Sequence, residues 1–331
     1  LYTAPDSERR ISELTFSPDG DWIAFLADSE LVGSRALHVV PIDASATAKR
    51  VSLAPVAANQ DVSQFVWSPD SLHIAFIGDL VTNNVAALWT VIATVIAPSP
   101  VEIVTTAELG DADVLRGLGF DSQSRLYFRT DLATGDTEQL LRADIAGTNR
   151  QQVPGTALAN DAGEAAVGTF AISPDGARIA FASESPSESL FQVFVLDLAG
   201  MAPALVSNLT TTAPVSGSSG PNFFEGMRWS PSGDRLVMTA DWPTPSGLDN
   251  DFGVFVLPTS GAPGGVRLAT PSAASGDAFG PHFTADGSGV VFLGDMMIDG
   301  QSDLFTTSDL ITPDQDLTTL RIIESAAGGN M

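Results

Sequence analysis

The sequence contains no cysteine, which excludes disulfide bonds, thiolate nucleophiles and zinc sites built on sulfur. Lysine occurs only once, at Lys49, so arginine carries nearly all of the positive charge. Long hydrophobic runs are also missing, because a stretch such as 85–97 is interrupted by polar residues and is too short to span a bilayer. We therefore expect no membrane insertion, while the lack of cysteine leaves the cellular compartment undecided.

The charge balance is strongly acidic. Forty aspartates and glutamates stand against 15 lysines and arginines, which gives a formal net charge of −25 at pH 7. A field of this sign repels phosphate-rich molecules and attracts cations or basic protein surfaces, so we expect no nucleic-acid partner. A simpler interpretation stays open, in which the acidity keeps an exported or salt-adapted protein in solution.

Six segments of the chain repeat one pattern, in which an apolar residue is followed by a short turn and an apolar strand. Their starts lie 51 to 57 residues apart. The segments are FSPDGDWIAFLAD (16–28), WSPDSLHIAFIGD (67–79), FDSQSRLYFRTD (120–131), ISPDGARIAFASE (172–184), WSPSGDRLVMTAD (229–241) and FTADGSGVVFLGD (283–295). A Ser-Pro-Asp-Gly turn is typical of a hairpin: proline presets φ, aspartate closes the turn through its side chain, and glycine takes the positive φ.

Two more apolar segments follow each hairpin, so each copy contains four expected strands. The third strands are expected at 36–42, 87–93, 139–145, 192–198, 253–258 and 303–307, and the fourth at 49–53, 101–105, 149–153, 204–206, 266–269 and 318–323. A lone four-stranded sheet cannot bury both faces, whereas six sheets arranged radially bury each face against a neighbour. The sequence therefore predicts an all-β fold, a six-bladed β-propeller with four antiparallel strands per blade.

We expect residues 1–331 to form a single propeller domain. Its blades are predicted at about 11–54, 62–106, 115–155, 167–208, 224–271 and 278–324. Blade three is the most degenerate copy, because its turn is one residue shorter and has neither proline nor glycine, so we expect an altered hairpin there. Residues 1–4 are expected to add a strand to blade six and close the ring.

The strand, the Ser-Pro-Asp-Gly turn and the Ile-Ala-Phe strand, as at 172–181, resemble the β-propeller repeat of the TolB family in every blade. Similar propellers occur in periplasmic scaffold proteins, in non-catalytic domains of prolyl oligopeptidase-like peptidases and in free-standing secreted proteins. Residues 1–10 leave no room for the additional N-terminal α/β domain of TolB, so roles of that domain are not implied. The start at Leu1 fits a mature chain whose export segment has been removed, or a trimmed chain. We expect a periplasmic or secreted monomer.

The residue that ends each second strand is acidic in all six copies. These candidate metal ligands are Asp28, Asp79, Asp131, Glu184, Asp241 and Asp295. Carboxylate oxygens are hard ligands, which favour calcium or magnesium over softer metals. All six cannot hold one ion, because the second strand lies about 5 Å out from the innermost strand. The simpler alternative is that each carboxylate caps the following turn by accepting backbone N–H groups.

Further binding candidates are expected near the start of the innermost strands, on the same face. They are Glu13, Gln64, Arg116, Glu225 and His282. Loop acids such as Asp61 and Asp277 extend this predicted acidic funnel. His38 and His73 are expected to be packing or surface residues. No catalytic residue is assigned, because no Gly-x-Ser-x-Gly elbow is present and no two histidines have a metal-ligand spacing.

Two functions stay open at this stage. The first is a non-enzymatic binding scaffold whose acidic, loop-rich face and channel mouth bind a divalent cation, with calcium favoured, or a basic protein partner. The second is a calcium-dependent ester or lactone hydrolase with an axial metal site. Asn222 and Glu225 imitate part of such a site by analogy with six-bladed lactonases, which is an argument from fold alone.

Overall fold

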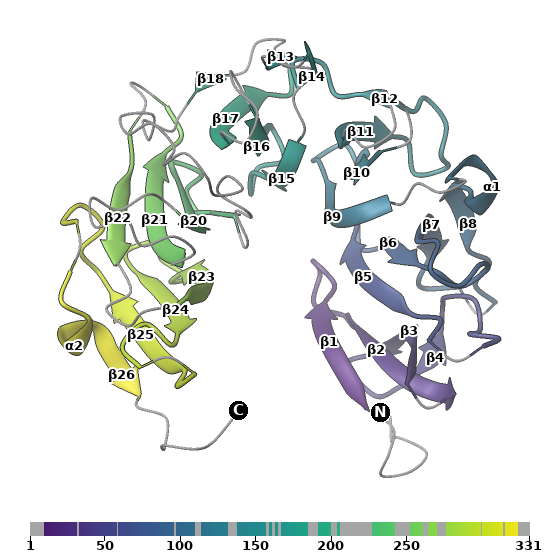
Figure 1. Ribbon diagram of the computed structural model, residues 1–331. Coiled ribbons are helices and arrows are strands. Elements are labelled where there is room, and N and C mark those ends of the chain that lie inside the picture. The colour runs from purple at the N-terminus through teal and green to yellow at the C-terminus, as the bar shows by residue number, and fades with distance from the viewer. Residues whose placement is uncertain are drawn as a thin grey trace. The chain divides into compact units, whose positions relative to one another are not determined.

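The computed structural model divides the chain into two compact units, Leu1–Val153 and Pro154–Met331. Figure 1 labels most of their strands in chain order. The residues that the structure describes are 10–31, 33–57, 59–95, 97–109, 114–131, 138–156, 159–160, 163–164, 167–184, 191–199, 204–205, 227–241, 252–260, 264–269, 276–298, 300–313 and 315–323.

The first unit contains three four-stranded antiparallel sheets in which sequence neighbours pair with each other (Figure 1). The first sheet consists of β1 (Ile11–Phe16), β2 (Trp22–Leu31), β3 (Ser34–Pro41) and β4 (Lys49–Arg50). The second consists of β5 (Val62–Trp67), β6 (His73–Gly78), β7 (Ala87–Ile92) and β8 (Val101–Val104). After one helical turn, α1 (Thr106–Leu109), the third consists of β9 (Val114–Phe120), β10 (Leu126–Thr130), β11 (Gln139–Ala143) and β12 (Gln151–Gln152).

The second unit repeats this plan after a small hairpin of β13 (Ala159–Asn160) and β14 (Gly163–Glu164). The fourth sheet consists of β15 (Val167–Ile172), β16 (Arg178–Glu184), β17 (Phe191–Asp197) and β18 (Ala204–Leu205). The fifth consists of β19 (Arg228–Trp229), β20 (Arg235–Asp241), β21 (Phe252–Pro258) and β22 (Val266–Ala269). The sixth consists of β23 (Ala278–Phe283), β24 (Val290–Gly294), β25 (Asp303–Thr307) and β26 (Arg321–Ile323), with the one-turn helix α2 (Leu317–Leu320) before its last strand.

The Ser-Pro-Asp-Gly segment forms the turn between the first two strands of a sheet. Ser17 Oγ accepts the N–H of Trp22 at 3.0 Å and donates to Asp19 Oδ1 at 2.5 Å. This hydrogen bond from Ser17 lowers the pKa of the Asp19 carboxyl below its ordinary value. Gly20 takes a φ of 79°, in the region that favours glycine. The same backbone bond to a hydroxyl is made by Ser68, Ser173, Ser230 and Thr284.

The third sheet has the altered hairpin that its sequence predicts. Asp121 stands in place of the serine and is fully buried. Its Oδ1 accepts the N–H groups of Gln123 and Arg125, both at 2.9 Å, while its Oδ2 binds Arg125 Nε at 2.6 Å and the Tyr127 hydroxyl at 3.1 Å. Ser124 takes the positive φ, 58°, in place of glycine. A carboxylate thus closes the shortened turn, and the prediction is confirmed.

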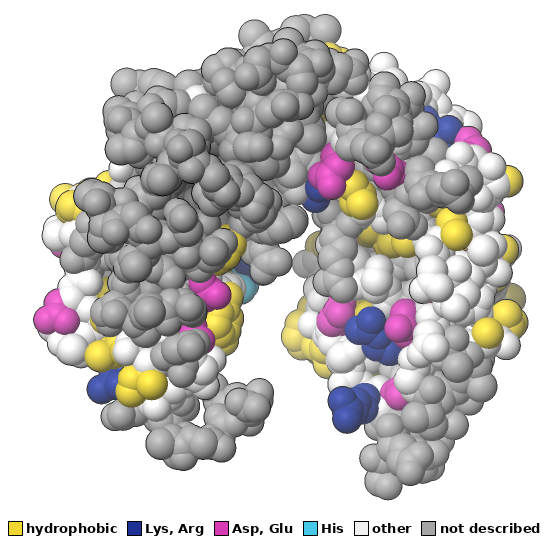
Figure 2. All heavy atoms as spheres, viewed as in Figure 1, with side chains coloured by type: hydrophobic (Ala, Val, Ile, Leu, Met, Phe, Trp, Pro, Cys, Tyr) yellow, Lys and Arg dark blue, Asp and Glu magenta, His cyan; other side chains and the backbone are white. Residues whose placement is uncertain are grey.

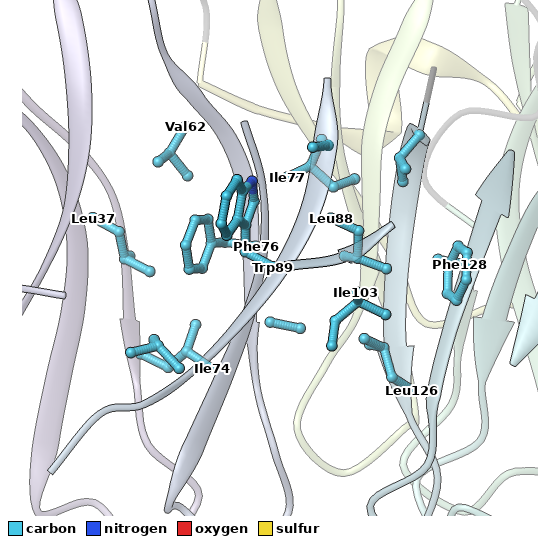
Figure 3. Packing of buried hydrophobic residues seen from close by; sticks show 14 of the residues in the cluster. Leu37, Val62, Ile74, Phe76, Ile77, Leu88, Trp89, Ile103, Leu126 and Phe128 are labelled. Atoms are coloured by element: carbon cyan, nitrogen blue, oxygen red, sulfur yellow. The ribbon is translucent and has the colours of Figure 1, made fainter. Parts of the chain in front are cut away.

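The core of the first unit lies between consecutive sheets. Leu37 of the first sheet, Phe76 and Trp89 of the second and Phe128 of the third belong to one cluster of buried apolar residues (Figure 3). The rings of Phe76 and Trp89 stack with centroids 6.3 Å apart. Each sheet therefore buries apolar side chains against its neighbour, which is the packing that the repeat predicts.

The second unit is packed in the same way. Val195 of the fourth sheet and Met238 of the fifth share one buried cluster, and Val254 of the fifth and Phe292 of the sixth share another. Arg178 reinforces the first of these contacts, because its guanidinium carbon lies 4.9 Å from the ring centre of Trp229. Within this unit, too, consecutive sheets are joined by apolar packing.

The predicted third and fourth strands are present with ends that differ by up to three residues, and one predicted segment is not a strand. Residues 318–320, expected to begin a strand, lie in α2, because the Asp316 side chain accepts the Thr318 N–H at 2.9 Å and starts a helical turn. The expected ring-closing strand at 1–4 lies outside the described residues, and the assignment of the chain to a single domain stays a prediction. In the part of the chain that the structure describes, no helix is long and apolar enough to cross a membrane.

Candidate functional site at the strand ends

The acid that follows a second strand binds the backbone on both sides of it. Oδ1 of Asp79 accepts the N–H of Asp61 at 2.6 Å, and Oδ2 accepts the N–H of Asn84 at 3.0 Å. Asp61 precedes the innermost strand β5, and Asn84 lies in the loop that leads to β7. One carboxylate therefore fixes the start of the innermost strand and the loop after the second strand.

This arrangement recurs in two other sheets with the same spacing, eighteen residues before the acid and five after it. Asp28 accepts the N–H groups of Arg10 and Gly33, and Asp295 accepts those of Asp277, at 2.7 Å, and Gly300, at 2.9 Å. The predicted strand end at Asp28 is wrong, because β2 continues to Leu31. The capping role that we set beside metal binding is thus present at three of the six acids. A cap does not by itself exclude a cation, because a carboxylate oxygen can accept more than one bond.

A second layer of carboxylates joins neighbouring sheets within each unit. Asp61 Oδ1 accepts the N–H of Arg35, the second residue of β3 in the preceding sheet, at 2.5 Å. Asp277 Oδ1 accepts the N–H of Phe252, the first residue of β21, at 3.1 Å. The N–H of each of these two acids donates to the strand-end acid of the same sheet. A continuous chain of hydrogen bonds therefore leads from that strand-end acid to the neighbouring sheet.

Arg35 also brings two predicted residues together. Its guanidinium lies 3.6 Å from Glu13 Oε1 and 3.6 Å from Asp61 Oδ1. Figure 2 shows basic side chains lying between acidic ones on the first unit. Glu13 sits at a bulge of β1 with a φ of 49°, and 44% of its side chain is exposed. A non-glycine residue at positive φ is held there by its surroundings, and here it presents a carboxylate to solvent.

The other predicted binding residues do not join this group. Gln64 Oε1 accepts the N–H of Gly117 at 2.8 Å, so it links the second sheet to the third. His282 differs from its expected position at a strand start: it lies one residue before the end of β23, is exposed, and has Nδ1 2.8 Å from the Gly280 carbonyl oxygen. Arg116 is the third residue of β9, but its side chain lies outside the described part of the structure. Glu225 and Asn222 lie outside it entirely.

The remaining predicted metal ligands occupy the expected strand ends. Asp131 directly follows β10, whereas Glu184 and Asp241 are the last residues of β16 and β20, and the side chains of these two are not described. Among the described residues, no group of three or more histidines and acids is arranged to hold a metal ion. Calcium binding therefore stays a prediction.

Sequence reasoning missed Arg35, because nothing marks the start of a third strand as a neighbour of the next sheet. The partnership of Asp61 with Asp79 could have been found, since the spacing of eighteen residues recurs at Asp277 and Asp295. A regular separation between two acids within a repeat was therefore the available signal.

No family model matches this sequence, and no curated protein matches it. Among solved structures, the chain is similar to TolB from Acinetobacter baumannii, with 15% identity and a TM-score of 0.49 over 91% of this chain and 61% of that one. Prolyl oligopeptidase B from Galerina marginata matches with 10% identity and a TM-score of 0.61 over 96% of this chain and 44% of that one. Hydrazine synthase from Kuenenia stuttgartiensis matches with 12% identity and a TM-score of 0.58 over 93% of this chain and 81% of that one.

The matches to prolyl oligopeptidase B and to hydrazine synthase support the assignment of the fold. At identities this low they show the fold alone. The chain spans less than two thirds of the TolB and prolyl oligopeptidase chains that it matches. Together with six four-stranded antiparallel sheets among the described residues, they define an all-β protein of the propeller class.

Proposed function

We propose that the chain is a non-enzymatic binding scaffold whose acidic strand ends engage a basic protein partner. The observation that carries this proposal is the group of Glu13, Arg35 and Asp61, in which an exposed carboxylate is presented on a fixed backbone. Fixed donors and acceptors lose little conformational freedom when a partner binds. The net charge of −25 adds long-range attraction for a basic surface. A periplasmic or secreted location is part of this proposal, and the resemblance of the repeat sequence to that of the TolB family supports it.

The contact with the partner is centred on Glu13. Asp61 and Asp79 are committed to backbone N–H groups, so their carboxylates contribute charge and keep the surface rigid. Glu13 lies 3.6 Å from Arg35, too far for a strong hydrogen bond, and an incoming arginine can bind its exposed oxygen.

A synthetic ten-residue Arg-Ser repeat peptide tests this surface by biolayer interferometry at low and at high salt. Glu13→Gln should weaken binding about fivefold at low salt, since a charge pair at a partly exposed site contributes about 1 kcal/mol. Asp234→Asn, at an exposed turn of the fifth sheet, removes the same charge and should change the affinity by less than about twofold. Equal effects of the two substitutions would show that the peptide responds only to net charge, and the proposed site would be wrong.

Calcium is a second candidate ligand, favoured by the oxygen-only chemistry of the strand-end acids. The second lone pairs of the Asp295 oxygens support it, because each oxygen accepts only one of the two N–H groups that the carboxylate caps. Calcium should then raise the melting temperature, and Asp295→Asn should reduce that rise. If neither calcium nor magnesium shifts the melting temperature of the parent chain, the metal proposal is wrong. Ester turnover that requires calcium and is lost in His282→Ala would instead support a hydrolase.

A further inference from the structure

The turn end of the second sheet carries large apolar side chains in solvent. We name Leu72, Ile92, Val95 and Val101 the turn-end patch; they are exposed by 48%, 44%, 39% and 48%. Ile92 pairs with His73 at the start of β6, and Val101 pairs with Thr90. The Leu72 carbonyl accepts the N–H of Ala93, directly after Ile92. The four residues therefore lie at one end of a single sheet, opposite the end that carries Asp79.

The equivalent positions in the other sheets have small or polar residues or prolines. Leu72 directly precedes the residue whose N–H binds the turn side chain, and the other five sheets have Asp21, Ser124, Ala177, Asp234 and Ser288 at this position. The strand partner of the first residue of β6 is Ile92, and the equivalent partners in three other sheets are Pro41, Asp197 and Pro258. The repeat itself therefore does not require an apolar residue at either position. Clustered exposed apolar side chains mark interaction sites.

The patch is fixed to its neighbours on both sides. The ammonium of Lys49 donates to the Val95 carbonyl oxygen and lies 5.5 Å from the ring centre of Trp22, both from the first sheet. The Thr90 hydroxyl donates to the Ile145 carbonyl oxygen of the third sheet at 2.8 Å. Because these bonds hold the surrounding backbone, the patch is presented as a rigid surface.

The charges around the patch are mainly negative. Asp70 lies in the same turn as Leu72, Asp21 and Asp43 lie at the turn end of the first sheet, and Asp144 lies at that of the third. The basic groups at this end include Lys49, which bonds to a carbonyl, Arg125, which bonds to Asp121, and Arg150, which pairs with Glu108. An acidic rim around an apolar centre complements a segment that carries apolar side chains beside lysine or arginine.

We infer that the turn-end patch is a second docking surface, which binds a basic amphipathic segment of another protein. It is separate from the acidic strand ends, since the two lie at opposite ends of the strands of the second sheet. The apolar side chains supply the contact, and the aspartates select for a cationic partner and against an acidic one. The like charge of the rim also disfavours a second copy of this chain and an anionic lipid surface.

The test uses a 14-residue Leu-Lys amphipathic peptide, with a Ser-Lys peptide of the same charge and a Leu-Glu peptide as controls, followed by fluorescence anisotropy. We expect the Leu-Lys peptide to bind at least about tenfold more tightly than either control. The double variant Leu72→Ser/Ile92→Thr should lose about tenfold in affinity. Val81→Thr, an exposed valine at the other end of the same sheet, should bind like the parent.

Unchanged affinity in the double variant, or equal binding of the Leu-Lys and Ser-Lys peptides, would overturn the inference. So would concentration-dependent self-association that the double variant abolishes. Binding to zwitterionic phosphatidylcholine vesicles that depends on Leu72 would overturn it as well. Melting curves of each variant show whether it remains folded. Glu13→Gln should leave binding of the Leu-Lys peptide within about twofold, so failure of this inference and failure of the strand-end proposal are distinguishable.

Discussion

Asp79 and Asp61 are joined by two hydrogen bonds, one from a peptide N–H to a carboxylate and one from a peptide N–H to a peptide carbonyl. The Asp79 side chain accepts the Asp61 N–H at 2.6 Å, while the Asp79 N–H donates to the Asp61 carbonyl oxygen at 3.2 Å. Asp295 and Asp277 repeat the same pair of bonds, the second at 3.1 Å. An acid at the end of the second strand thus has a structural task that alone accounts for its recurrence at these positions.

Removing this carboxylate should destabilise the first unit. Asp79→Ala leaves the N–H groups of Asp61 and Asn84 without an acceptor, so we expect a loss of about 2 kcal/mol in the free energy of unfolding. Asp79→Asn keeps one acceptor oxygen and should lose about 1 kcal/mol. Urea unfolding measures both, with Asp21→Ala at an exposed turn position as the control. Equal stability of the Ala variant and the parent would contradict the capping role.

Two substitutions at turn positions with positive φ should change stability in opposite directions, because one removes a glycine and the other introduces one. No atom lies within 4 Å of the Cβ that Gly20→Ala would add, so its cost comes from the φ of 79° and should be about 1 kcal/mol. Ser124→Gly relieves a φ of 58° and should stabilise by about 0.5 kcal/mol, after the entropy that glycine adds to the unfolded chain. Denaturation midpoints at an unchanged m-value check the two signs. A destabilised Ser124→Gly would mean that the serine side chain contributes more than the backbone gains.

Buried His38 should make stability depend on pH. Burial lowers the pKa of its imidazole below the ordinary 6.5, and a bond to the Ala36 carbonyl oxygen opposes this in part. Since the folded pKa is lower than the unfolded one, the contribution of neutral His38 is complete above pH 6.5. It is lost as the pH falls from 6.5 towards the folded pKa, by at most about 1.4 kcal/mol per pH unit.

Unfolding free energies at pH 7.5, 6.5 and 5.5 measure this dependence. His38→Phe, which keeps a ring stacked on Phe25, should flatten the dependence across this window. His282→Gln, at an exposed histidine, should leave it as in the parent. An unchanged slope in His38→Phe would show that another group is responsible.

The ion pair of Glu108 and Arg150 joins α1 to the third sheet and should make the stability of the protein fall at acid pH. A hydrogen bond from Arg150 Nη2 at 2.7 Å, aided by the Thr105 N–H, lowers the pKa of Glu108 from 4.5 to about 2. The contribution of this carboxylate is present above pH 4.5 and is lost as the pH falls towards 2. Arg150→Gln should raise the pKa of Glu108 towards 4.5 in a carboxyl NMR titration, whereas Arg235→Gln in the other unit should not change it.

How far the sequence could predict the molecule differs between the strands and the candidate site. The strands follow from local signals, because the turn chemistry at Ser17, Ser68 and Ser173 fixes where two strands meet. The one wrong segment, 318–320, depended on whether Asp316 would cap a helical turn. Arg35 could not be predicted, since its partners Glu13 and Asp61 lie on a different strand and in the next sheet.

The sequence by itself determined the repeat, the four strands of each copy and an acid at or near the end of each second strand, since these depend on neighbours within a few residues. Only the tertiary structure decided which atoms the acids bind. The choice of Asp79 between a cation and the Asp61 N–H depends on distances between segments eighteen residues apart. The exposure of Leu72 and Ile92 likewise depends on what packs beside them, which no local pattern encodes.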